Sequence, residues 1–287
     1  MYKESIELKI DHGKCIRCGL CVEKCVNRVL SMGKEGGYPE EAEDGGSARC
    51  IHCAHCVMIC PEGALSIDGI SPDSCPAPGI FPDPERMRDL LRGRRSFRHY
   101  KRENVPQETL RELLDAMRFS PTGVNNHRLH FAVVDNLESM DTLREYTNSK
   151  VLELLEKAPD SAPAMKFAPS KQAILKGEDP IFRRAPHLLL VSSPEDAPCA
   201  EIDPIIALSY FELYAQSRNI GTLWCGRAMS AFHSAAPEVF RFLGIPEHYR
   251  PGYAMLFGIP EFGFQRVVIP SSVRVSRPLG KNIASFR

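Results

Sequence analysis

Residues 15–25 read CIRCGLCVEKC, and residues 50–60 read CIHCAHCVMIC. Both stretches have the spacing C-x2-C-x2-C-x3-C, so the chain contains an internal repeat that holds eight of its 11 cysteines. A disulfide framework is the first alternative. It requires an oxidising compartment, and the stretch before Cys15 lacks the apolar core of a secretion signal. We therefore expect these cysteines to bind metal in a reducing cytoplasm.

The repeat predicts two 4Fe–4S clusters. Three closely spaced cysteines can surround three corners of a cubic cluster, and the fourth ligand comes from elsewhere. In two-cluster ferredoxins the fourth cysteine of each run binds the other cluster. On that rule the first cluster is held by Cys15, Cys18, Cys21 and Cys60, and the second by Cys50, Cys53, Cys56 and Cys25. A pair of zinc sites is the alternative, but zinc usually takes two close cysteines from each of two separated knuckles, and that scheme gives no role to the third and fourth cysteine of each run.

This region resembles the bacterial-type ferredoxins that carry two 4Fe–4S clusters. Short β-type runs flank the repeat, and residues 33–46 are expected to form a polar loop. Val26 stands where proline is usual after the first run. We interpret His52 and His55 as ordinary loop residues.

Composition indicates two domains and a linker. A length of 287 residues suggests about two domains. Residues 71–84 contain five prolines, so they should form an extended, semi-rigid linker between a ferredoxin domain (1–70) and a larger domain (85–287). The small domain and linker are acidic, with 8 basic and 12 acidic residues over 1–78, against 28 and 24 in the rest of the chain.

Several function classes are excluded by the sequence. Lys+Arg and Asp+Glu are both 36, so no basic field for nucleic acid exists. No apolar run approaches the roughly 20 residues that a membrane span needs. Neither a G-x-G-x-x-G nor a P-loop motif occurs, which leaves a dinucleotide-binding Rossmann unit without support.

The larger domain mixes helices and strands, which predicts an α+β fold with a modest sheet and a helical core. Helical periodicity is found over 107–117, 137–157 and 203–217, and strand patterns over 130–135, 187–193 and 252–259. The very apolar helix at 203–217 should be buried on most sides.

Two motifs of the larger domain can bind a phosphorylated planar cofactor. Arg94-Arg95-Ser96-Phe97-Arg98 offers guanidinium groups and a hydroxyl that can grip a phosphate, although a solvated basic helix end is the simpler alternative. Ser120-Pro121-Thr122-Gly123-Val124-Asn125-Asn126-His127 can bring backbone close to a flat ring, although an ordinary turn explains it equally.

In this order and spacing the motifs resemble those of the nitroreductase family of flavin enzymes. The chain also has GTLWCG at 221–226, FGIP at 257–260 and a basic residue at Arg266, and the resemblance covers 85–270. His127, Arg128 and Leu129 depart from the Gln, Pro and Trp that are usual. The resemblance implies a nitroreductase-type α+β sandwich that binds FMN as a homodimer.

The resemblance also implies which residues bind FMN. The phosphate and ribityl oxygens would be bound by Arg94, Arg95, Ser96, Arg98 and Arg266. The flavin would be bordered from the partner chain by Pro121, Thr122, Gly123 and Asn125, and the backbone of Cys225 and Gly226 would face the flavin N5 region. Cys225 is interpreted as a small wall residue. His127 and His130 remain either proton donors or structural histidines, so no catalytic residue is assigned.

The predicted function is that of a cytoplasmic oxidoreductase. Electrons pass from the clusters to FMN and on to a small acceptor such as a nitroaromatic, a quinone or an activated alkene. A ferredoxin, another redox protein or NAD(P)H is the donor. Reductive dehalogenation, with residues 158–184 as a lid, is one alternative; a non-enzymatic relay or redox sensor is the other. Residues 265–278 are expected to extend the partner subunit's sheet.

Overall fold

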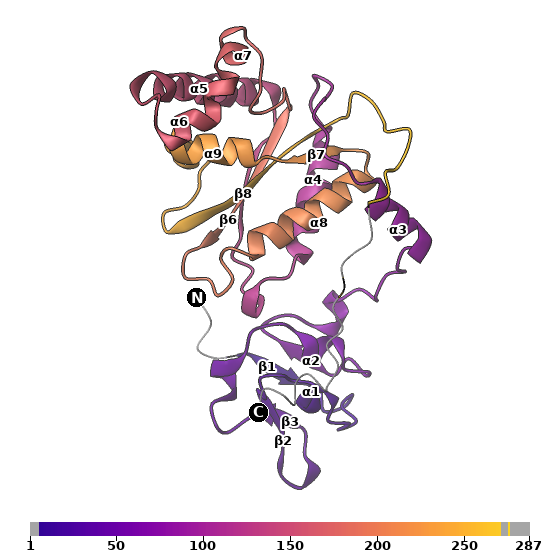
Figure 1. The fold of residues 1–287 in the computed structure, drawn as a ribbon. Coiled ribbons are helices and arrows are strands. Elements are labelled where there is room, and N and C mark those ends of the chain that lie inside the picture. Colours follow the sequence, from indigo (N-terminus) through magenta and orange to yellow (C-terminus); the bar gives the residue numbers. More distant parts are fainter. Residues whose placement is uncertain (1–5, 271–274, 276–287) are drawn as a thin grey trace, which may run out of the picture.

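The computed structural model describes residues 6–270 and residue 275. Figure 1 shows a small N-terminal domain below a larger domain built around a sheet. Within the predicted linker, residues 75–83 contain no helix or strand. The predicted extension over 265–278 lies partly outside the described residues. None of the described helices has the length and apolarity needed to cross a membrane.

The described part of the small domain contains two short α-helices and two pairs of antiparallel strands. Strand β1 (Leu8–Ile10) pairs with β4 (Leu65–Ile67), and β2 (Leu30–Met32) pairs with β3 (Pro39–Glu41). The helices are α1 (Leu20–Glu23) and α2 (His55–Met58), one in each copy of the repeat. The prediction of a plain loop over 33–46 is wrong at β3, because left-handed Gly36 turns the chain back onto β2.

The larger domain is built on one four-stranded antiparallel sheet in the order β5-β6-β8-β7. The strands are β5 (His130–Val134), β6 (His187–Pro194), β7 (Gly221–Trp224) and β8 (Tyr249–Gly258). Three of them match the expected strands; β7 was not predicted. The α+β fold class is confirmed.

Helices cover both faces of this sheet (Figure 1). One face carries α5 (Leu137–Lys157), α6 (Ala162–Phe167) and α9 (Gly226–Ser234), and the other α4 (Gln107–Ala116) and α8 (Asp203–Ser217). The remaining helices are α3 (Pro84–Gly93), α7 (Lys171–Leu175) and α10 (Glu238–Phe242). Side chains alternate between the faces along β6, so both faces are buried apolar surface.

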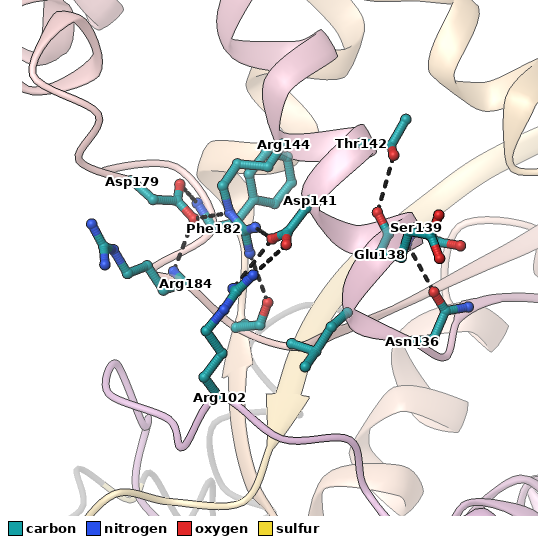
Figure 2. A network of polar contacts seen from close by, with 12 residues as sticks. Arg102, Asn136, Glu138, Ser139, Asp141, Thr142, Arg144, Asp179, Phe182 and Arg184 are labelled. Atoms are coloured by element: carbon teal, nitrogen blue, oxygen red, sulfur yellow. Dashed lines mark hydrogen bonds and ion pairs between the residues drawn. The ribbon is translucent and has the colours of Figure 1, made fainter.

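The segment expected to act as a lid is part of the core. Phe167 and Phe182 within it are almost fully buried. Asp179 accepts hydrogen bonds from Arg144 Nε of α5 (2.6 Å) and from the backbone N–H of Phe182 (2.7 Å), and Figure 2 shows this network. Residues 158–184 are thus fastened to α5.

Helix α8 departs from its predicted burial. Its inner face is buried, as expected from its composition, but Ile205, Tyr210 and Tyr214 remain 38–44% exposed. Ile202, just before the helix, is 58% exposed. These four residues, which we call the α8 stripe, form an apolar face.

Candidate cofactor sites

Two cavities of the small domain are lined by cysteines. The first brings together Cys15, Cys18, Cys21 and Cys60. The second brings together Cys25, Cys50, Cys53 and Cys56. Each cavity therefore receives three cysteines from one run and the fourth from the other. This is the grouping that the crossed rule predicts for two cubic clusters.

The surroundings of these cysteines fit iron–sulfur ligation. Backbone N–H groups of Val29, His52 and Ala64 donate to the Sγ atoms of Cys25, Cys50 and Cys60 at 3.2–3.4 Å. Such bonds stabilise thiolates and tune the potential of a cluster. Among the described residues, no three His, Cys, Asp or Glu side chains are grouped to hold a single metal ion.

Burial makes three of these thiols weaker acids than a free cysteine. It raises the pKa of the Cys56 thiol to about 11, and the pKa values of Cys21 and Cys50 are raised for the same reason. Because only the thiolate is a ligand, metal binding at these sites has to release protons. Formation of the sites is consequently coupled to pH.

The arginine motif lies at the β7 edge of the sheet. Ser96 forms a parallel bridge with Thr222, and the N–H of Phe97 donates to the Thr222 carbonyl at 2.9 Å. The ring of Phe264 lies 5.1 Å from that of Phe97, which brings the segment before Arg266 alongside. The structure thus places the R-x-S-x-R, GTLW and Arg266 segments together.

The arginines of this motif have different surroundings. Arg94 donates to Glu212 Oε1 at 3.1 Å, and this carboxylate is only 9% exposed. Arg94 therefore neutralises a buried charge, which the sequence did not reveal. Arg98 and Arg266 are exposed and Arg95 is half-buried. This donor set suits a phosphate, and Arg94 also has a structural task.

Cys225 and Gly226 lie where β7 meets α9. The Cys225 Sγ accepts from the N–H of Ala228 and lies 3.4 Å from the Ile181 carbonyl. Burial raises the pKa of this thiol to about 11, so it stays protonated near neutral pH. A Cβ on Gly226 would lie 2.6 Å from the Tyr253 hydroxyl, so a larger residue there would require the Tyr253 side chain to move.

The second motif forms a tightly bonded loop that leads into β5. The N–H of Gly123 donates to both carboxylate oxygens of Asp203 at 3.0–3.1 Å, and Thr122 Oγ1 accepts from the N–H of His127. Pro121, which directly precedes Thr122, is exposed. An open pocket adjoins the loop and is lined by Leu114, Asp115, Met117, Arg118, Ser120, Thr122, His127, Leu129 and Phe131. Asp203 was missed because it is distant in sequence.

The two histidines near this loop differ. His127 is exposed, and its Nε2 lies 2.8 Å from Asn125 Oδ1. The ring of His130 packs edge-on against Tyr249, and burial lowers its pKa. Both rings therefore contact other protein groups, and no catalytic role is assigned to either.

Asn125 contacts the small domain. Its Nδ2 donates to the carbonyls of Ile51 (3.1 Å) and His52 (3.2 Å), between two cysteines of the second cavity. His52 is itself paired with Asp68 at 2.6 Å. The sequence offered no signal for this contact, because about 70 residues separate the partners.

One chain does not bring the two motifs together. The arginine motif adjoins β7, and the 120–127 loop adjoins β5, at the opposite edge of the sheet. Each edge therefore carries half of the predicted flavin site.

Comparisons with known proteins match both domains. The sequence profile described as "Nitroreductase family" matches residues 91–259, and that of the "4Fe-4S dicluster domain" matches 14–65. Ferredoxin-3 of Nostoc sp. is 36% identical over 70 residues, covering 20% of this chain and 72% of that protein. Both domains expected from the motifs are thus confirmed.

Two further relatives match the larger domain. Iodotyrosine deiodinase of Thermotoga neapolitana is 26% identical over 144 residues, covering 47% of this chain and 70% of its own. A crystal structure of a nitroreductase with bound FMN from Desulfitobacterium hafniense has a TM-score of 0.52 at 26% identity, covering 66% of this chain and 98% of that one.

Proposed function

The chain belongs to the nitroreductase family, and we propose that it is an FMN-dependent oxidoreductase supplied with electrons by its own two 4Fe–4S clusters. The observation that carries the proposal is the grouping of eight cysteines into two four-cysteine cavities, in one chain with a nitroreductase domain. Such thiolate ligands require a reducing compartment, so we place the protein in the cytoplasm.

We assign the FMN phosphate and ribityl chain to the β7 edge. When bound, FMN supplies one- and two-electron chemistry, including hydride transfer to an oxidised acceptor. Arg95, Ser96, Arg98 and Arg266 offer the hydrogen-bond donors, and Arg94 joins them while it neutralises Glu212. Gly226 leaves room beside Tyr253 for the ring system to approach the backbone.

A second copy of the chain would complete the site. Pro121, Thr122, Gly123 and Asn125 would border the flavin from the partner subunit, because they lie at the far edge of their own sheet. The exposed α8 stripe supports such an interface, since apolar surface of this kind is normally covered. We expect light scattering to find a homodimer, and Tyr210→Asp to lower both dimerisation and FMN retention. A monomer that retains FMN would contradict the dimeric site.

We propose small oxidised organic molecules as acceptors: nitroaromatics, quinones or activated alkenes. The similarity to an iodotyrosine deiodinase favours reductive dehalogenation as the second candidate. A relay or redox sensor without a small acceptor is the remaining alternative. Residues 158–184 are fastened to the core, so substrate choice would depend on the walls of the flavin site.

The decisive experiment is anaerobic reduction of the reconstituted protein. We expect about eight iron and eight sulfide per chain, because each group of four cysteines would bind one 4Fe–4S cluster. We expect reduced ferredoxin to reduce the flavin, and an acceptor of the classes above to reoxidise it; NADH and NADPH are tested as direct donors. Zinc without sulfide would refute the cluster assignment. A flavin that stays oxidised while the clusters are reduced would refute the electron route.

A further inference from the structure

The two domains meet at a cluster-binding loop. Ile51 and His52, whose carbonyls accept from Asn125, lie between Cys50 and Cys53 of the second cavity. Ile51 also lines that cavity. Figure 1 shows the β2–β3 hairpin at the end of the small domain that points away from the sheet. The contact between the domains thus joins the 50–53 loop, which lines the second cavity, to the 120–127 loop, which is assigned to the flavin.

The orientation of the Asn125 amide is fixed. Its Oδ1 faces His127 Nε2 at 2.8 Å, so its Nδ2 is turned toward the small domain. Asn125 and His127 both adopt left-handed backbone angles, with φ of 56° and 44°. Such angles persist only where surrounding bonds hold them, and the loop is bonded to the buried Asp203. The amide is thus presented on a rigid loop.

We propose that Asn125 is a docking residue that holds the 50–53 loop against the larger domain, so that the cluster of Cys25, Cys50, Cys53 and Cys56 is the one that exchanges electrons with the flavin. This inference rests on the proposed function. Each transfer oxidises that cluster by one electron and reduces the flavin by one, and water would supply the protons that the reduced flavin takes up. A reduced ferredoxin-type protein replaces the electron.

The test uses Asn125→Asp in the full-length holoprotein. The carboxylate can still accept from His127, but it cannot donate to the two carbonyls. Asn219→Asp is the matched control, because Asn219 is exposed, has a φ of 57° and belongs to the same domain. Two readouts are compared: hydrogen exchange of the amides of residues 50–54, and rapid-freeze EPR with flavin absorbance after mixing with reduced ferredoxin.

We expect Asn125→Asp alone to speed exchange at 50–54 and to slow flavin reduction about tenfold, as loss of two hydrogen bonds implies. Cluster reduction should keep its rate. Equal exchange and equal flavin reduction in the two variants would overturn the docking role.

A second pair of variants tests which cluster reduces the flavin. The two substitutions are Cys18→Ala and Cys53→Ala, which lie at equivalent positions of the repeat. Cys53→Ala should slow flavin reduction more than Cys18→Ala does, and the reverse order would overturn the assignment. If a cysteine variant fails to fold, the comparison of Asn125→Asp with Asn219→Asp still tests the docking role of Asn125. If the parent protein never passes electrons from clusters to flavin, the proposed function fails instead.

Discussion

Asp179→Asn is expected to destabilise the larger domain strongly. The Asp179 side chain is 2% exposed, and its oxygens accept from Arg144 Nε (2.6 Å) and from the backbone N–H groups of Phe182 (2.7 Å) and Arg184 (2.8 Å). Asparagine has the same shape, but it replaces one acceptor oxygen by an NH2 group that faces a donor. The change also leaves the guanidinium of Arg144, 12% exposed, with less negative charge nearby.

The expected loss is about 3 kcal/mol. Breaking a buried ion pair by removing one partner costs roughly 3–5 kcal/mol, and Arg144 keeps Asp141 as a second partner, which places the estimate at the lower end. A domain of this size has a urea dependence of about 2–3 kcal/mol per molar. The unfolding midpoint should therefore fall by about 1 M.

Urea unfolding followed by fluorescence measures this effect, because Trp224 is the single tryptophan and lies in the larger domain. Glu178→Gln is the control: it removes a neighbouring charge from an exposed side chain and should leave the midpoint unchanged. If Asp179→Asn and Glu178→Gln unfold at the same urea concentration, the network does not fasten residues 158–184 to the core.

Three further changes test the site and the core. Arg98→Ala should lower FMN affinity about tenfold or more in a flavin titration and leave urea unfolding of the apoprotein unchanged, since Arg98 is exposed. Burial lowers the pKa of His187 to about 4 from 6.5. Between pH 6.5 and pH 4 the imidazole of His187 is protonated in the unfolded chain but neutral in the folded one. The free energy of unfolding should therefore fall by about 3 kcal/mol as pH falls from 6.5 to 4. His187→Gln, which keeps an acceptor for the Val105 N–H, should show a shallower pH dependence of the urea midpoint. Cys225 should resist iodoacetamide at pH 8 in the native protein, and mass spectrometry that finds it alkylated as fast as Cys199 would contradict its burial.

Features with a local signature could be predicted from the sequence. The cysteine repeat predicted the two groups that line the cavities, and apolar periodicity predicted α5 at its observed bounds. Strand β7 was missed because its four residues are too few to show an alternating pattern. Motif order placed the larger domain in its family, although the cofactor residues assigned from the motifs remain a prediction.

Contacts between distant segments could not be predicted. Glu212 lies on an apolar helix, and only the fold brings Arg94 beside it. Asp203 and the amide of Gly123 are 80 residues apart. The exposed α8 stripe could not be predicted either, because a helix that is apolar on most sides does not reveal which side stays exposed.

The positions of the two half-sites lead to a last prediction about mixed dimers. If the arginine motif of one chain meets the 120–127 loop of its partner, a dimer of one Arg98→Ala chain and one Asn125→Asp chain has one site with both defects and one site with neither. If each chain builds its own site, both sites of the mixed dimer carry a defect. Co-expression with two affinity tags isolates the mixed dimer, and flavin reduction by reduced ferredoxin is then measured. We expect about half of the flavin sites to be filled and reduced at the parent rate. A mixed dimer without any fast phase of flavin reduction would show that each flavin site is built from one chain. It would also show that the clusters of one chain do not reduce a flavin whose phosphate is bound by the other chain.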